Sequence, residues 1–298
     1  MQIAGTSLLT AAAFSSTGAS AQKKRSFNIS LAAWSLHKTI GRDPKLVDML
    51  EMPKMTKGEF GIEIIELVNQ QMRSDDAAYI GQLGKNAAAE GVDISLIMID
   101  GQGNIGSEDE AERKSAVTKH SHWVDIASDL GADTIRMNWA GAPKDLMKGP
   151  QDAIQAFIDR SVPAFHDLCD YADKKSVNVI IENHGGPSSH PTALIPLMKA
   201  VNHPRFGTLP DFGNFYDGVD RYDATDQMMA YAKAVSAKCY QFDEKTGDET
   251  KIDFEKMLQI VCDKHGYTGN IGIEYEGDVQ SEAYGIKAAK ALLERLRG

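Results

Sequence analysis

Cysteine is scarce in this chain of 298 residues, which has only Cys169, Cys239 and Cys262. Their spacing matches neither a zinc motif nor a disulfide framework, and an odd number of cysteines cannot pair completely. We therefore expect no structural bridge and interpret the three residues as small apolar side chains.

Basic residues and long apolar runs are also in short supply. The chain has 32 Lys and Arg residues against 42 Asp and Glu, a net charge of −10. A nucleic-acid-binding surface needs a basic face, so the composition argues against a nucleic-acid partner. Beyond residue 26 no apolar run is long enough to cross a bilayer, and the sequence predicts no membrane span in the mature chain.

The first 21 residues differ in kind from the rest, because they are small or apolar and carry no charge. The segment 19–21, Ala-Ser-Ala, has the small-x-small form of a signal-peptidase site, with cleavage before Gln22. We expect residues 1–21 to be an export signal and residues 22–298 to be a periplasmic or secreted domain. A disordered tail rich in Ala, Ser and Thr is the alternative.

Short apolar runs, rich in β-branched or aromatic residues, recur along the rest of the chain and end at polar or glycine positions. They cover residues 28–36, 61–69, 92–100, 132–140, 178–185, 206–214, 236–243 and 270–277. Helix-like segments lie at 76–91, 108–131, 153–176, 224–235, 253–266 and 281–297. Pro163 is expected to kink or divide the third of these helices.

Strands that alternate with helices predict a parallel sheet covered by helices, an α/β fold. Eight such units at this length favour a single-domain (β/α)8 TIM barrel over residues 22–298. A doubly wound open sheet is the alternative, but the Gly-rich phosphate-binding turn of that fold is missing after the first run.

Acidic residues stand at the ends of three apolar runs, where a barrel gathers its chemistry. The pairs are Glu182 with His184, Asp211 with Asn214, and Glu274 with Glu276. Three converging carboxylates repel one another unless a divalent cation, a shared proton or a cationic side chain intervenes. Oxygen ligands with one or two imidazoles suit Mn²⁺, Mg²⁺, Co²⁺ or Zn²⁺. Solvated strand ends are the alternative reading.

The seventh run supplies a cationic side chain. Val235, Ala237 and Cys239 form a small apolar set that suits packing against outer helices. Alternation along a strand then directs Ser236 and Lys238 into the barrel. A buried lysine is costly unless anions surround it, and the predicted carboxylates would do so.

Further polar and aromatic residues follow other runs, and their types are those of a sugar-binding site. An aromatic platform lies under a sugar ring, while amides, carboxylates and an arginine contact its hydroxyls. The candidate substrate-binding residues are Trp34, His37, Asn69, Arg136, Asn138, His184 and Asn214.

The segments IIENHGG, PDFGNF, AKCYQFDE and GIEYEG occur in this order over about residues 27–298. This ordered set resembles the sugar phosphate isomerase/epimerase family, a branch of the xylose isomerase-like TIM barrels. The resemblance implies a metal held at Glu182, Asp211, Ser236 and Glu274. It also implies that the two glutamates are an acid/base pair that moves a proton on and off a carbon beside a carbonyl.

The chain departs from the family pattern in the seventh run. The family often has His-x-Lys there, whereas this chain has Ser236, Ala237 and Lys238, and Asn214 stands where relatives often have a histidine. Serine is a poor ligand for a divalent metal. Either water, His184 or Gln241 fills the fourth position, or metal binding is weak or absent.

These observations favour a metal-dependent carbohydrate isomerase or epimerase that works through an enediolate, with Lys238 as a third catalytic residue. A keto-glycoside lyase or hydrolase using the same carbanion is one alternative. A non-catalytic sugar-binding barrel is another. Phosphodiester cleavage is disfavoured, because the chain has neither a His-rich metal cluster nor a basic DNA-binding face. The expected partner is a small carbohydrate, and a homo-oligomer is compatible with the sequence.

Overall fold

The computed structural model describes residues 24–216 and 218–298. The predicted export signal at residues 1–21 and its cleavage site therefore lie outside the described residues. Within those residues no helix is both long enough and apolar enough to span a bilayer.

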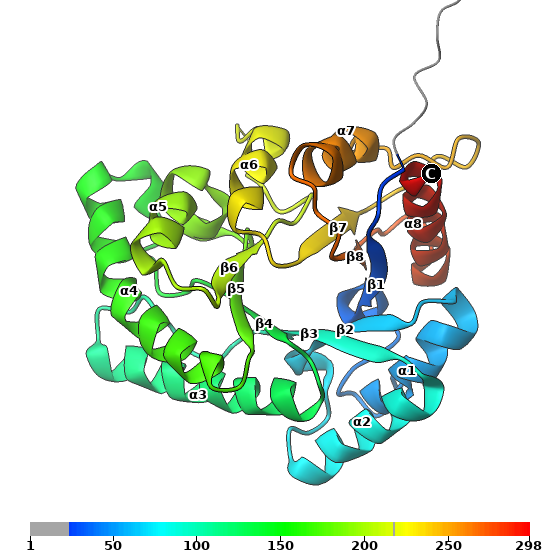
Figure 1. Cartoon of the computed structure of the whole chain (residues 1–298), viewed down its shortest axis with the longest axis horizontal. Helices are drawn as coiled ribbons and strands as arrows, with labels where there is room; N and C mark the ends of the chain where they lie inside the picture. Colours follow the sequence, from blue (N-terminus) through cyan, green and yellow to red (C-terminus); the bar gives the residue numbers. More distant parts are fainter. Residues whose placement is uncertain (1–23, 217) are drawn as a thin grey trace, which may run out of the picture.

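Eight parallel strands form one sheet, in the order β6-β5-β4-β3-β2-β1-β8-β7. They are β1 (Asn28–Ala32), β2 (Ile64–Val68), β3 (Asp93–Ile99), β4 (Thr134–Met137), β5 (Asn178–Glu182), β6 (Phe206–Leu209), β7 (Val235–Cys239) and β8 (Asn270–Tyr275). Two isolated parallel bridges, Thr208 with Ala232 and Asp211 with Ser236, join β6 and its extension to β7. The predicted α/β barrel is therefore confirmed, and Figure 1 shows its helices outside the strands.

The helices alternate with the strands. They are α1 (Met52–Met55), α2 (Ala77–Glu90), α3 (Glu110–Asp129), α4 (Gln151–Asp173), α5 (Pro191–Val201), α6 (Arg221–Met228), α7 (Phe254–Leu258) and α8 (Glu282–Arg297). Local chemistry fixes several of their ends. The Asp76 side chain accepts the Tyr79 N–H at the start of α2, and Gly91 ends that helix in the left-handed region at φ 62°.

Helices α4 and α5 each contain an internal proline. Helix α4 runs through Pro163 without division, because Phe157 and Phe165 are buried on either side of it and hold both halves against the barrel. The sequence analysis did not predict α5, whose segment contains two prolines. Pro191 lies in the first turn, where no backbone donor is required, and Pro196 is tolerated inside the helix.

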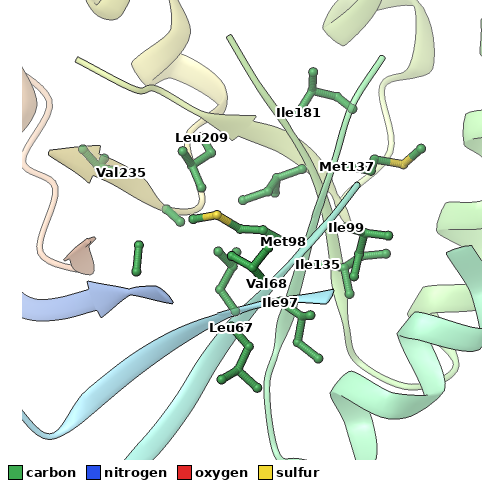
Figure 2. Packing of buried hydrophobic residues seen from close by; sticks show 14 of the residues in the cluster. Leu67, Val68, Ile97, Met98, Ile99, Ile135, Met137, Ile181, Leu209 and Val235 are labelled. Atoms are coloured by element: carbon green, nitrogen blue, oxygen red, sulfur yellow. The ribbon is translucent and has the colours of Figure 1, made fainter. Parts of the chain in front are cut away.

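Along the strands the odd-numbered side chains are mostly apolar, whereas the buried polar side chains lie at even-numbered positions. Figure 2 shows buried apolar residues of the strands, among them Leu67, Ile97, Ile135, Ile181 and Val235, together with Val68 and Met98 at even positions. The neighbouring even-numbered positions contain the polar side chains that meet inside the barrel. They include Ser30, Glu66, Arg136, Glu182, Ser236, Lys238 and Glu274, all buried. The apolar face thus packs the fold, while the opposite face of the same strands builds the site.

The three cysteines are free and buried, as their spacing predicts. Cys239 belongs to β7, and Cys169 and Cys262 lie in the helical layer. Burial raises the pKa of the Cys169 thiol to about 12 and that of Cys262 to about 11. Neither of these thiols is a thiolate nucleophile near neutral pH.

Candidate active site

Three carboxylates come together at the carboxyl ends of β5, β6 and β8. Glu182, Asp211 and Glu274 each offer an oxygen atom within 4.8 Å of the others, and all three side chains are buried. They are the three residues that the sequence analysis proposed as metal ligands. Like charges this close inside a protein require compensation, which the surrounding side chains provide in part.

Asp211 is fixed by the backbone on two sides. Its Oδ1 accepts the N–H groups of Gly213 at 2.8 Å and Asn214 at 2.7 Å. The Asn183 amide donates to the Asp211 carbonyl at 3.0 Å and accepts the Asp211 N–H at 2.8 Å. These bonds leave Oδ2 directed at the other acids. Burial raises the pKa of Asp211 to about 7, against the influence of Lys238.

Ser236 lies between two of the acids. Its hydroxyl oxygen is 2.8 Å from Asp211 Oδ2 and 2.9 Å from Glu274 Oε2. A hydroxyl carries one hydrogen, so it can donate to only one of these two oxygens at a time. The second oxygen then faces a lone pair, and the contact is favourable only if a proton or a cation lies nearby.

Glu182 is paired with Arg136 of β4. Arg136 Nε lies 2.7 Å from Glu182 Oε2, although the two atoms are not aligned as a hydrogen bond. The other oxygen, Oε1, accepts the Asn214 amide at 2.9 Å. Burial raises the pKa of Glu182 to about 7, even though Arg136 acts in the opposite direction.

Glu274 is paired with Lys238, its neighbour across the β7–β8 ladder. Lys238 Nζ lies 2.6 Å from Glu274 Oε1, 3.1 Å from Glu276 Oε1 and 3.9 Å from Asp211 Oδ2. Burial alone would raise the pKa of Glu274, yet Lys238 holds it below its usual range. Burial alone would lower the pKa of Lys238, yet the acids hold it above its usual range.

Gly213 makes room for this lysine. A Cβ atom at position 213 would lie 2.5 Å from Lys238 Cγ and 2.4 Å from the Tyr240 hydroxyl. A larger residue at position 213 would therefore collide with the stem of Lys238.

A second polar branch extends from Arg136 toward β3. Its NH1 atom donates to Asp100 Oδ1 at 2.6 Å, and the Asn138 amide donates to the same oxygen at 2.6 Å. Asn69 pairs instead with the backbone of Asp100, through its amide at 2.9 Å and its side-chain oxygen at 3.0 Å. Asn69 thus joins the ends of β2 and β3, and its hydrogen-bonding groups face the protein.

The remaining predicted residues lie in the loops above the barrel. Trp34 is half-buried in a 3₁₀ turn directly after β1, and His37 Nδ1 lies 2.7 Å from the Trp34 carbonyl oxygen. The His184 side chain is exposed and adds no nitrogen to the carboxylate cluster. Gln241 follows β7, where its backbone N–H and carbonyl bond with Glu249 and Thr250.

Two buried residues of this region have roles that the sequence analysis did not assign. Asn183, which positions Asp211, lies between the two residues of IIENHGG that drew attention as functional. Ser30 donates to Glu66 Oε1 at 2.6 Å inside the barrel. The alternation of side chains along a strand could have indicated Ser30, because Ser30 lies on the face of its strand that points into the barrel. No sequence pattern indicates the role of Asn183.

Glu66 is a buried acid with no cationic partner beside it among the described residues. Its Oε2 atom has no hydrogen-bond partner there, and a Cβ atom at Gly272 would lie within 2.6 Å of both carboxylate oxygens. Burial raises the pKa of Glu66 from its ordinary 4.5 to about 7. Glu66 is therefore largely protonated in the folded state at mildly acidic pH.

The raised pKa of Glu66 predicts how the stability of the fold changes with pH. Between pH 4.5 and 7 the folded protein holds a proton that the unfolded chain has released, so the free energy of unfolding falls as pH rises. Glu66→Gln should raise the free energy of unfolding by roughly 2–3 kcal/mol at pH 8 and change it little at pH 4. Urea unfolding at both pH values measures the difference. An equal gain at both would contradict it, and Glu244→Gln, at an exposed position, is the control.

Comparison with known proteins identifies the family of the chain. Residues 58–297 match the profile of the xylose isomerase-like TIM barrel family. The chain belongs to this family. No curated protein matches the sequence.

Members and relatives of the family share the fold at low identity. An L-ribulose 3-epimerase structure is 17% identical, with a TM-score of 0.73 over 91% of this chain and 94% of that chain. A D-tagatose 3-epimerase-like protein is 16% identical, with a TM-score of 0.71 over 91% and 97%. A xylose isomerase-like TIM barrel protein from Mycobacterium smegmatis, solved in complex with magnesium, is 17% identical, with a TM-score of 0.66 over 91% and 97%.

Proposed function

We propose that the protein is a carbohydrate epimerase or isomerase that moves a proton at a carbon next to a carbonyl. The observation that carries this proposal is a pair of buried glutamates, Glu182 and Glu274, that belong to one cluster of acids. Each is held by its own cation, since Arg136 lies 2.7 Å from Glu182 and Lys238 lies 2.6 Å from Glu274. Two carboxyl groups fixed in this way at one site suit the removal and the return of a proton.

The residues divide the reaction as follows. Ionised Glu274 accepts the proton from the carbon, and the electron pair moves onto the carbonyl oxygen to give an enediolate. The Lys238 ammonium, 2.6 Å from Glu274, is positioned to stabilise the developing negative charge. Glu182, as the acid of the pair, then delivers a proton to the opposite face or to the neighbouring carbon. The first outcome is epimerisation and the second is isomerisation.

The donor set fits a hard divalent cation. It consists of three carboxylates and the Ser236 hydroxyl, with Glu182 Oε2 buried and lacking a hydrogen bond among the described residues. All-oxygen sites of this kind favour Mg²⁺ or Mn²⁺ over metals that prefer imidazole or thiolate ligands. Glu182, Asp211 and Glu274 would hold the ion, which would supply Lewis-acid polarisation of the substrate oxygen.

The metal assignment predicts a loss of bound ion. Glu182→Gln and Asp211→Asn each remove one anionic ligand, so each should lower the Mn²⁺ content of the purified protein at least severalfold. Elemental analysis after dialysis against a fixed Mn²⁺ concentration measures this. Glu276→Gln, at the half-exposed strand end beside the cluster, should keep the wild-type content. Unchanged content in both ligand variants would show that these carboxylates do not bind metal.

The activity itself is tested by proton exchange. The Mn²⁺-loaded protein is incubated in D₂O with a panel of ketopentoses and ketohexoses, and NMR follows deuterium at the carbon beside the carbonyl. Exchange together with formation of an epimer or isomer supports the proposal. Binding of a sugar without exchange indicates the non-catalytic sugar-binding barrel instead.

Export from the cytoplasm stays a prediction from residues 1–21, and N-terminal sequencing of the protein from its host tests it.

A further inference from the structure

A cleft of about 670 Å³ opens beside the candidate active site. Its lining comes from three loops, and apolar and ring-bearing side chains predominate. They include Pro143, Leu146, Met147, Pro187, His190 and Tyr216. The three loops follow β4, β5 and β6, which are the strands that lead to Arg136, Glu182 and Asp211. The cleft therefore lies on the catalytic face of the barrel.

Chain connectivity places the cleft close to the acids. Tyr216 is two residues beyond Asn214, whose amide donates to Glu182 at 2.9 Å. Two residues span at most about 7 Å between Cα atoms. The Tyr216 hydroxyl accepts the N–H of Gly186, so the loops after β5 and β6 are joined at this point. The loop after β6 thus contacts the acids through Asn214 and lines the cleft through Tyr216.

Tyr216 presents an aromatic surface there. It is 46% exposed, one of few large apolar side chains with this accessibility among the described residues. Its ring lies 5.3 Å from the His190 ring at an interplanar angle of 32°. A ring held by a neighbouring ring and by a hydrogen bond is a rigid platform for another flat group.

The charges of the cleft are confined to its rim. Lys144, Asp145 and Lys148 are exposed, and Lys148 pairs with Asp145 at 2.9 Å. No charged side chain of the lining is buried, so the cleft lacks the buried cations that would compensate a phosphate group. Its apolar walls suit an uncharged aromatic ring better.

We propose that this cleft binds an aromatic ring joined to the sugar through its anomeric oxygen. The substrate is then an aryl glycoside whose carbonyl lies on the sugar ring, rather than a free sugar or a sugar phosphate. This inference rests on the proposed function for the position of the sugar, and it assigns the second half of the substrate. The anomeric carbon of a glycoside is blocked, so the carbonyl belongs on another ring carbon.

The test compares two ligands that differ only in the group on that oxygen. Calorimetry with the Mn²⁺-loaded protein measures the affinity of methyl and phenyl β-glycosides of 3-keto-glucose. The phenyl glycoside should bind about tenfold more tightly, equivalent to ~1.4 kcal/mol. Tyr216→Ala should abolish that gain. Tyr216→Phe, which keeps the ring beside His190 but loses the hydroxyl that bonds to Gly186, should retain most of it. The methyl glycoside should bind equally to all three proteins.

Each outcome separates the cleft from the catalytic proposal. Equal affinities of the two glycosides in the wild type would overturn the cleft assignment and leave the proton-transfer proposal standing. A phenyl gain that survives Tyr216→Ala would overturn the role of Tyr216 as platform. Tight phenyl binding that depends on Tyr216, without deuterium exchange into the bound keto-glycoside in D₂O, would support the cleft and contradict the proposed activity.

Discussion

Replacement of Glu274 by glutamine should lower kcat by about 10³-fold or more, because the amide cannot accept a proton from carbon. The substitution preserves shape and leaves Lys238 a second anionic partner, Glu276, at 3.1 Å. Folding should therefore survive. The rate of deuterium incorporation into the substrate from D₂O measures the step directly, without contributions from product release.

Glu276→Gln is the matched control for this variant. It removes a carboxylate one residue beyond the end of β8, where the side chain is 36% exposed and outside the acid cluster. Its kcat should fall by less than tenfold. If both glutamine variants lose activity equally, the charge around Lys238 matters rather than a base at position 274.

Lys238→Met should lower kcat by about 10²-fold or more, the effect of losing one preorganised donor at the developing oxyanion. KM should change little, because the ammonium acts more strongly on the transition state than on the bound substrate. Steady-state kinetics on the Mn²⁺-loaded variant gives both constants. Methionine keeps most of the stem, so the packing against Gly213 is largely preserved.

The competing role for Lys238 is that of a counter-ion alone. Lys238 lies within 3.9 Å of Asp211 and within 2.6 Å of Glu274, so its removal also exposes buried acids to one another. In that case the variant would mainly change in stability and in metal affinity, and excess Mn²⁺ would restore full activity. Full restoration by metal would contradict a catalytic role for Lys238.

The barrel was predictable because its signals are local and repeated. Each strand is an apolar run, and each run ends where polar residues begin, as β5 does at Glu182. The inward direction of Lys238 followed from the parity of three small residues around it. Helix α5 was not assigned from the sequence; its segment contains two prolines, and burial of residues such as Leu194 and Leu197 against the barrel accompanies the helix in the fold.

The detailed contacts of the site depend on distances that no local pattern contains. The sequence places Arg136 on a strand but not beside Glu182, because the pairing of β4 with β5 fixes that contact. Asn69 is a residue type that often binds sugar hydroxyls, yet its side-chain amide donates a hydrogen bond to the backbone carbonyl of Asp100. The cleft beside Tyr216 is built from three loops that are distant in sequence, and no single segment indicates it.

Arg136 and Lys238 have a consequence for the order of events during maturation. Both cations lie within 2.7 Å of an acid of the cluster, so they partly offset the repulsion among the buried carboxylates without a metal. Small zinc-binding domains fold only when their metal arrives, since the ion supplies their stability. We expect this chain, in contrast, to complete its barrel without an ion. If it binds one afterwards, the metals present where the folded protein meets the ion would decide which metal it holds.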